Sequence, residues 1–212
     1  MSLRTLVLCD DTWHPAETIR RGLTALGDCG FAFEFLEDGT KWSADAMINF
    51  PLVVLAKANI TSSTVERPWL TPDSQQVFPD YVQRGNGLVV VHADTSRYDQ
   101  LPAMLELIGG AFLHHPDQCA VTVSPKPGHP AAVDVAPFTL RDEHYFMAMN
   151  DACVDVFLHS RSEYGVQPAG WTRTQGEGRV CVLTPGHNEE VWLHPSFQKL
   201  LLNALRWTAK TN

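Results

Sequence analysis

Short apolar runs alternate with amphipathic stretches through the first half of the chain, and this pattern restricts the fold more than any other feature of the sequence. A strand that is apolar on both faces must be covered on both sides, which is typical of parallel sheets with crossover helices. The pattern therefore predicts an α/β fold around a mostly parallel central sheet. The expected parallel strands are residues 3–8, 31–36, 52–56 and 88–91.

Helices are expected between and after these strands, because apolar residues there recur at helical spacing. Their expected ranges are residues 17–26, 44–49, 73–84, 99–108 and 195–210. Residues 57–72 are polar and irregular, and a compact domain usually keeps such a long loop for a functional reason. A lid and an oligomer contact fit this loop equally well.

The second half has a different rhythm, since its short apolar runs are separated by loops rich in Pro and Gly, with no long helix between them. Such runs favour an antiparallel extension of the sheet. The expected strands are residues 120–123, 138–140, 154–158 and 179–183, with a hairpin from residues 171–173 to 176–179.

Charge excludes two classes of partner. The 212 residues include 16 Lys and Arg against 24 Asp and Glu, a net charge of −8, whereas nucleic acids and anionic membranes require clustered cations. No apolar run approaches the ~20 residues of a membrane span, and the first residues lack a signal-peptide pattern. We expect one cytoplasmic domain over residues 1–212, with neither nucleic acid nor membrane as partner.

The five cysteines are odd in number and widely spaced, and most lie inside apolar runs. This pattern predicts buried thiols in a reducing compartment and argues against a disulfide framework or a CxxC zinc site. The cysteines are Cys9, Cys29, Cys119, Cys153 and Cys181.

Histidine or acidic residues follow most of the predicted strands. In open α/β sheets, ligands bind beyond the carboxyl ends of the strands, where loops and helix N-termini converge. We therefore expect these side chains to meet in one pocket. In chain order they are Asp10, Asp11, His14, Lys57, Asn59, His92, Asp94, His187 and Glu189.

Each candidate has an assigned role. We expect His92, His187, Glu143 and Tyr145 to be catalytic; Glu143 and Tyr145 lie two residues apart, on one face of a strand. Asp10, His14, Asp94 and Glu189 are the expected substrate-binding residues. Imidazoles with carboxylates suit Zn²⁺, although no HxxxH or HExxH spacing is present. The expected metal ligands are His14, His92, His114 and His187.

A structural role remains open for most of these residues. A histidine such as His92 can instead bond a neighbouring carbonyl, and Glu143 with Tyr145 can form the solvated face of an edge strand. His129 and His194, each followed by proline, read as loop or helix-start residues, and His144 and His159 as packing or surface residues.

Five motifs occur in an order and at a spacing that resemble the ThuA-like (trehalose-utilisation) family, mainly over residues 80–210. The motifs are Gly87-Leu-Val-Val-Val-His92, Gly109-Gly110-Ala-Phe112 before His114 and His115, Gly128-His129-Pro130, Asp142-Glu143-His144-Tyr145, and the tail from Trp171 through Pro185-Gly186-His187 to His194-Pro195. The resemblance implies a flavodoxin-like three-layer sandwich of the class I glutamine-amidotransferase-like superfamily.

Amidotransferases of that superfamily carry a Cys on a sharp turn after a central strand and a late His-x-Glu motif. His187 and Glu189 resemble the second feature, but the turn after Val91 begins with His92, and no thiol stands there. Because neither His nor Ala supplies a thiolate nucleophile, glutamine hydrolysis is not expected.

The resemblance implies a role in carbohydrate utilisation. The leading hypothesis is an enzyme that acts on a disaccharide or keto-sugar through a pocket of histidines and carboxylates, with Zn²⁺ as the candidate cofactor. The alternative is a non-catalytic sugar-binding or regulatory module on the same frame. A small carbohydrate is the expected partner, and a homo-oligomer is compatible with either reading.

Overall fold

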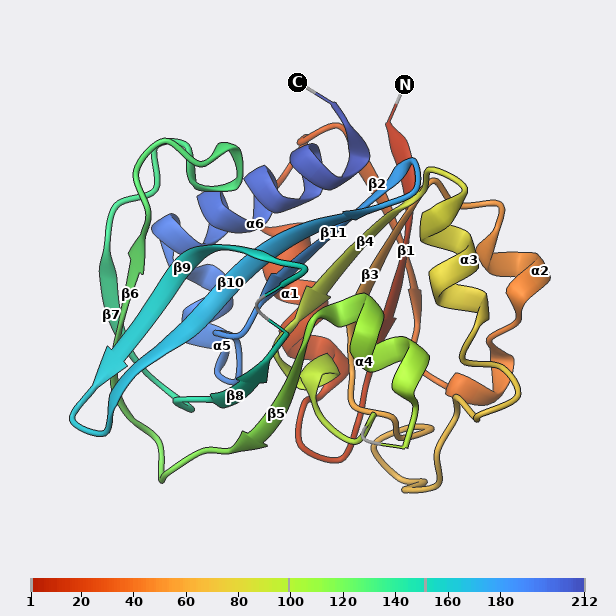
Figure 1. Ribbon diagram of the computed structural model, residues 1–212, viewed down its shortest axis with the longest axis horizontal. Coiled ribbons are helices and arrows are strands. Elements are labelled where there is room, and N and C mark those ends of the chain that lie inside the picture. Colours follow the sequence, from red (N-terminus) through yellow and green to blue (C-terminus); the bar gives the residue numbers. More distant parts are fainter. Residues whose placement is uncertain (1, 99, 151, 212) are drawn as a thin grey trace.

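The computed structural model describes residues 2–98, 100–150 and 152–211, apart from the side chain of Asp94. Its main feature is a nine-stranded sheet in the order β2-β1-β3-β4-β11-β10-β9-β6-β7 (Figure 1). The first five strands of that order run parallel to one another. They are β2 (Phe31–Leu36), β1 (Leu3–Cys9), β3 (Leu52–Ala56), β4 (Gly87–Val91) and β11 (Gly178–Leu183).

The remaining strands extend this sheet in antiparallel fashion, as the short apolar runs of the second half predict. They are β10 (Gly165–Gln175), β9 (Asp155–Ser162), β6 (Cys119–Pro125) and β7 (Phe138–Asp142). One expectation is wrong: residues 179–183 belong to β11, which pairs in parallel with β4 and completes the parallel half. Val180 to Leu183 are buried, so this strand has the burial of a central one.

Helices cover both faces of the sheet and give three layers, which confirms the predicted α/β class. One face packs against α1 (Ala16–Thr24), α5 (Glu189–Leu193) and α6 (Pro195–Ala209). The other packs against α2 (Ala44–Met47), α3 (Val77–Gln83) and α4 (Pro102–Ile108). In Figure 1, α4 lies in front of the parallel strands and α6 behind the sheet. None of the described helices is long and apolar enough to cross a membrane.

Two helices begin later than predicted. The expected helix at residues 73–84 begins at Val77, so that Pro79 falls in its first turn, where no backbone donor is needed. The expected helix at residues 99–108 begins at Pro102, whose fixed φ suits the first helical position. Asp99, its predicted first residue, lies outside the described residues.

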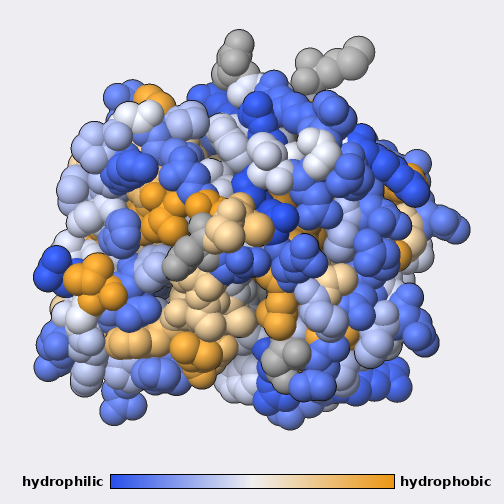
Figure 2. Space-filling model, viewed as in Figure 1, coloured by the Kyte–Doolittle hydropathy of each residue, from blue (hydrophilic) through white to orange (hydrophobic). Residues whose placement is uncertain are grey.

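A small second sheet was not predicted. It pairs β5 (Gly110–His114) with β8 (Phe146–Met149) in antiparallel fashion beside α4. Figure 2 shows apolar side chains gathered over this region of the viewed face, and Leu113 of β5 is 60% exposed. The connection from β7 to β8 carries Glu143, so this sheet helps to bring that carboxylate to its place.

The loop at residues 57–72 is anchored rather than loose. Asn59 donates to the carbonyl of Leu70 and accepts from its N–H, and Thr61 donates to the carbonyl of Arg67 from both its hydroxyl and its N–H. At its start Lys57 is 1% exposed, and its Nζ donates to the carbonyls of Cys9, Glu37 and Thr61 at 2.9–3.2 Å. The Lys57 ammonium group thus links the end of β1, the residue after β2 and the loop itself.

The five cysteines, all within the described part of the chain, are free thiols, as predicted. Their expected burial holds only for Cys9 and Cys181, because Cys29 and Cys119 are half-buried and Cys153 is exposed. Cys153 lies in the turn before β9, outside both layers of the core.

Candidate functional site

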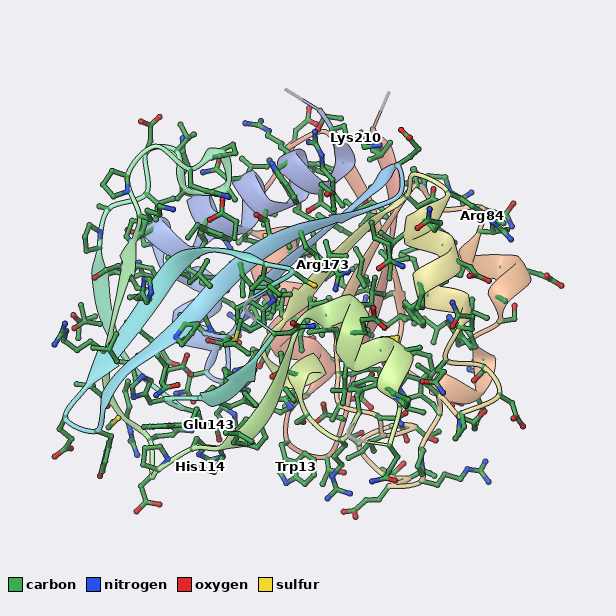
Figure 3. All side chains as sticks on the ribbon, in the orientation of Figure 1. Trp13, Arg84, His114, Glu143, Arg173 and Lys210 are labelled. Atoms are coloured by element: carbon green, nitrogen blue, oxygen red, sulfur yellow. The ribbon has the colours of Figure 1, made fainter. Side chains whose placement is uncertain are left out.

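Four side chains that are distant in sequence meet at the carboxyl edge of the parallel strands. His14 follows β1, His92 follows β4, His187 follows β11, and Glu143 follows β7. One potential ligand atom from each lies within 4.8 Å of the others. We call these four residues the His–Glu cluster. Figure 3 places Glu143 at the same edge of the molecule as Trp13, far from Lys210 at the opposite end.

His92 stands at the sharp turn where β4 becomes a short 3₁₀ helix. Its φ is +52°, a region that a non-glycine residue adopts only when its surroundings impose it. The Nδ1 atom lies 2.7 Å from the carbonyl oxygen of Thr184 and must donate to it, so in the neutral ring Nε2 carries the lone pair. The expected carbonyl bond is therefore present, and it leaves the second nitrogen free to face the cluster.

Asp11 holds His14 in the same way. The Nδ1 atom of His14 lies 2.8 and 3.0 Å from the two carboxylate oxygens of Asp11, which also accept from the N–H groups of Trp13 and Ala58. Both side chains are buried. Burial lowers the pKa of His14 more than Asp11 raises it, so the ring is neutral with its lone pair on Nε2.

Glu143 lies between two imidazoles. Its Oε2 is 3.3 Å from Nε2 of His92, and its Oε1 is 3.2 Å from Nδ1 of His187. Burial raises the pKa of Glu143, but the two histidines outweigh it and hold the pKa well below the usual range. The same contact with Glu143 raises the pKa of His187. Glu143 is therefore a carboxylate at neutral pH.

Asp142 positions the loop that carries His187. Its buried carboxylate accepts from the N–H groups of Gly186 and His187 at 2.9 and 3.0 Å. These bonds join the end of β7 to the loop after β11. Because Asp142 precedes Glu143 and bonds the backbone of His187, it fixes the positions of these two side chains relative to each other.

A cavity of about 340 Å³ opens beside the cluster, with His14 and Glu143 in its wall. Aromatic rings line it: Trp13, Phe112 and Tyr145. The ring of Tyr145 stacks on that of His92, with centroids 4.3 Å apart. Burial raises the pKa of the Tyr145 phenol well above its ordinary value, and so the hydroxyl remains protonated.

Three predicted site residues do not join the cluster. Asp10 accepts from the N–H groups of Ala16 and Ser63, so its carboxylate holds the start of α1 and the loop at residues 57–72 in place. Glu189 reaches Arg21 at 2.9 Å and joins α5 to α1. His114 is exposed and stacks on Phe146, because it still belongs to β5 and points away from the cavity lined by His115. The side chain of Asp94 lies outside the described part of the chain.

Two contributors were missed. His115, not His114, approaches Glu143, with Nε2 3.4 Å from Oε1. Because successive residues of a strand point to opposite sides, a strand at residues 110–114 would have indicated that His114 and His115 face different ways. That strand was not predicted from the sequence. Asp11 was noted only as a polar residue after a strand. Asp11 lies three residues before His14, and this spacing alone does not indicate a contact. The contact depends on the turn that brings Asp11 back to His14.

Comparison with known proteins decides the family. A family model described as ThuA, trehalose utilisation, matches residues 6–208. The chain belongs to the ThuA family. Its three layers agree with the fold that the resemblance implied. No curated protein matches this ThuA chain.

Solved structures share the fold of this ThuA chain at low identity. A ThuA-like protein from Parabacteroides merdae has a TM-score of 0.76 at 16% identity, covering 99% of this chain and 90% of that one. One from Bacteroides uniformis has a TM-score of 0.73 at 19% identity, covering 97% and 91%. A β-galactosidase from Rahnella sp. R3 has a TM-score of 0.71 at 12% identity; the match covers all of this chain and 32% of the enzyme.

Among the described residues, no cysteine lies at the turn after β4. The turn after β4 presents the imidazole of His92, and no cysteine belongs to the cluster among the described residues. Cys9, at the end of β1, is buried, and burial raises the pKa of its thiol to about 12. It is therefore a neutral thiol at physiological pH.

Proposed function

We propose that this ThuA-family chain is an enzyme of carbohydrate utilisation that acts on a small sugar or keto-sugar bound beside the His–Glu cluster. The observation that carries the proposal is the convergence of four titratable side chains, two of which, His14 and Glu143, stand in the wall of an aromatic-lined cavity. Aromatic faces suit the apolar faces of pyranose rings, whereas carboxylate and imidazole groups suit sugar hydroxyls and carbonyls.

The charge states support proton transfer rather than passive binding. At neutral pH the cavity presents a carboxylate from Glu143, a neutral imidazole from His14 and a protonated phenol from Tyr145. A polar substrate therefore meets acceptors, a donor and aromatic rings in the same cavity. Groups with such different protonation states are typical of acid–base sites.

The cavity volume limits the substrate. Its 340 Å³ is at the small end of ligand sites, which favours one sugar ring enclosed with a second ring reaching the opening. In the wall of the cavity the guanidinium of Arg97 lies over the ring of Trp13, 4.7 Å from its centroid. Two structurally similar proteins from Salmonella are described as cytoplasmic, and we propose the same compartment here, in agreement with five free thiols.

Turnover of defined sugars tests the proposal. Purified protein is incubated with trehalose, sucrose and their keto derivatives, and products are followed by proton NMR. We expect conversion of at least one sugar, reduced about a hundredfold or more by Glu143→Gln. His159→Gln changes an exposed histidine outside the site and serves as the matched control.

Two outcomes contradict the proposal. If a sugar raises the Tm of the protein but is never converted, the chain is the non-catalytic binding module instead. If no sugar is converted and none raises the Tm, the cavity does not serve carbohydrates.

A further inference from the structure

We propose that His14, His92, His187 and Glu143 form a binding site for one first-row divalent transition-metal ion. Metal binding is a property of this donor set alone, so it stands or falls independently of any activity on sugars. The proposal rests on three features of the cluster: the hydrogen bonds behind the rings, the unpartnered nitrogens in front, and the distances between donors.

The hydrogen bonds behind two of the rings are those of metal-binding histidines. A ligating imidazole almost always donates its other N–H to a carboxylate or a backbone carbonyl, which fixes the tautomer and the ring orientation. His14 donates from Nδ1 to the carboxylate of Asp11, and His92 donates from Nδ1 to the carbonyl of Thr184. In both rings the lone pair of Nε2 is thereby directed into the cluster.

Three nitrogens in front of the rings lack hydrogen-bond partners among the described residues. They are Nε2 of His14, Nε2 of His92 and Nδ1 of His187, and all three atoms are buried. The carboxylate of Glu143 is close to two of them, but its oxygens lie off the directions in which those nitrogens form hydrogen bonds. Buried polar atoms without partners are costly and rare, and three at one point call for a shared partner.

The distances fit a single ion. Donors about 2.1 Å from a tetrahedral metal ion lie about 3.4 Å from one another. Glu143 is already 3.3 Å from His92 and 3.2 Å from His187, and the widest separation in the set is within 4.8 Å. The three rings are steeply inclined to one another, by 71° to 82°, and can approach from different directions without stacking. Small side-chain rotations complete the sphere.

The donor types select the class of ion. Three imidazoles with one carboxylate suit Zn²⁺, Fe²⁺, Co²⁺ or Mn²⁺, whereas Mg²⁺ and Ca²⁺ prefer oxygen ligands. No cysteine thiolate contributes among the described residues, so a soft ion such as Cu⁺ is not favoured. Because His14 and Glu143 also line the cavity, an ion held here is within reach of a bound molecule.

Metal titration of the full chain tests the inference. The metal content of the purified protein is measured by mass spectrometry, and the chelator-stripped protein is titrated with Zn²⁺, Mn²⁺, Mg²⁺ and Ca²⁺ by calorimetry and thermal unfolding. We expect one equivalent of Zn²⁺ or Mn²⁺ to bind and raise the Tm. We expect Mg²⁺ and Ca²⁺ to bind about a hundredfold more weakly or not at all.

Matched variants locate the site. His187→Asn removes the most exposed of the three imidazoles, which limits damage to the core, and we expect its Zn²⁺ affinity to fall about a hundredfold or more. His114→Asn removes an exposed histidine nearby and should leave the affinity unchanged. Binding of Co²⁺ gives visible absorption bands that report the ligands directly, and these should change in Glu143→Gln if that variant folds.

Either of two results overturns the inference: no Zn²⁺, Mn²⁺ or Co²⁺ binding by the wild type, or binding that His187→Asn and Glu143→Gln leave intact. Sugar turnover is not a readout here. A protein that binds the metal but converts no sugar contradicts the proposed function and leaves the metal site standing.

Discussion

The Nδ1 atom of His14 lies 2.8 Å from a carboxylate oxygen of Asp11, and both side chains are buried. The same carboxylate also holds the backbone of its own turn and, through Ala58, the end of β3. Asp11 therefore has two roles: it stabilises the edge of the sheet, and it orients the His14 ring toward the cluster.

Replacement of Asp11 by Asn should affect both properties. The amide can no longer accept from the His14 ring and from the backbone N–H groups of Trp13, His14 and Ala58 at once. We therefore expect a loss of about 1–3 kcal/mol in the free energy of unfolding. Zn²⁺ affinity should fall about ten- to a hundredfold, because the ring loses its fixed tautomer. Urea denaturation and calorimetry measure the two effects. Asp10→Asn, in the same turn, is the control and should retain the wild-type affinity; equal losses in both variants would refute a specific role for Asp11.

Tyr145 offers a test that preserves packing. In Tyr145→Phe the ring can still stack on His92 while the buried hydroxyl is lost. If this hydroxyl donates to the bound sugar, kcat should fall about tenfold or more while Zn²⁺ binding remains unchanged. Steady-state kinetics on the sugar found by NMR check this. Unchanged kcat with raised KM would instead assign the hydroxyl to binding alone.

Lys57 should be essential for stability although it lies outside the cluster. Its ammonium group is the shared donor for three main-chain carbonyls, and Lys57→Met leaves all three without this donor. We expect a loss of about 3 kcal/mol or more in the free energy of unfolding, measured in urea. Lys41→Met changes an exposed lysine and should cost little. Similar small losses in both variants would show that water replaces the ammonium group.

His129 should make the protein sensitive to acid. Its Nδ1 accepts from the N–H of Ala131 and its Nε2 faces Thr172. Burial lowers the pKa of His129 below its usual 6.5, although Asp155 opposes this and Lys126 adds to it. The unfolded chain therefore takes up this proton first, and the free energy of unfolding decreases as the pH falls below about 6.5.

Denaturation at about pH 7.5 and about pH 5.5 measures this dependence. The loss on acidification should be smaller in His129→Asn, which keeps an acceptor for Ala131 but cannot be protonated. His159→Asn, at an exposed position, should behave like the wild type. An identical pH dependence in His129→Asn and the wild type would contradict the assignment.

Much of the site could be predicted because one topological rule governs it. Residues that follow parallel strands gather at one edge, and this rule selected His14, His92 and His187 before any coordinates. The rule could not separate Asp10 from Asp11 or His114 from His115. Which aspartate faces His14 depends on the positive φ of 75° at Asp10, and which histidine faces the cavity depends on the unpredicted strand β5. Neither feature produces a periodic pattern in the sequence. Glu189 does not join the cluster because it begins α5 and pairs with Arg21 of α1.

The turn at His92 has a consequence for how this scaffold changes its chemistry. The left-handed backbone at position 92 is imposed by the strand before it and by the segment from Thr184 to Gly186 packed against it. Whatever side chain is encoded at this position is delivered to the same point in space. In amidotransferases of the superfamily that the sequence resembles, a sharp turn after a central strand presents a thiol, and here such a turn presents the imidazole of His92. A single codon at this position thus decides whether the turn presents a thiol or an imidazole, without a change in the surrounding fold.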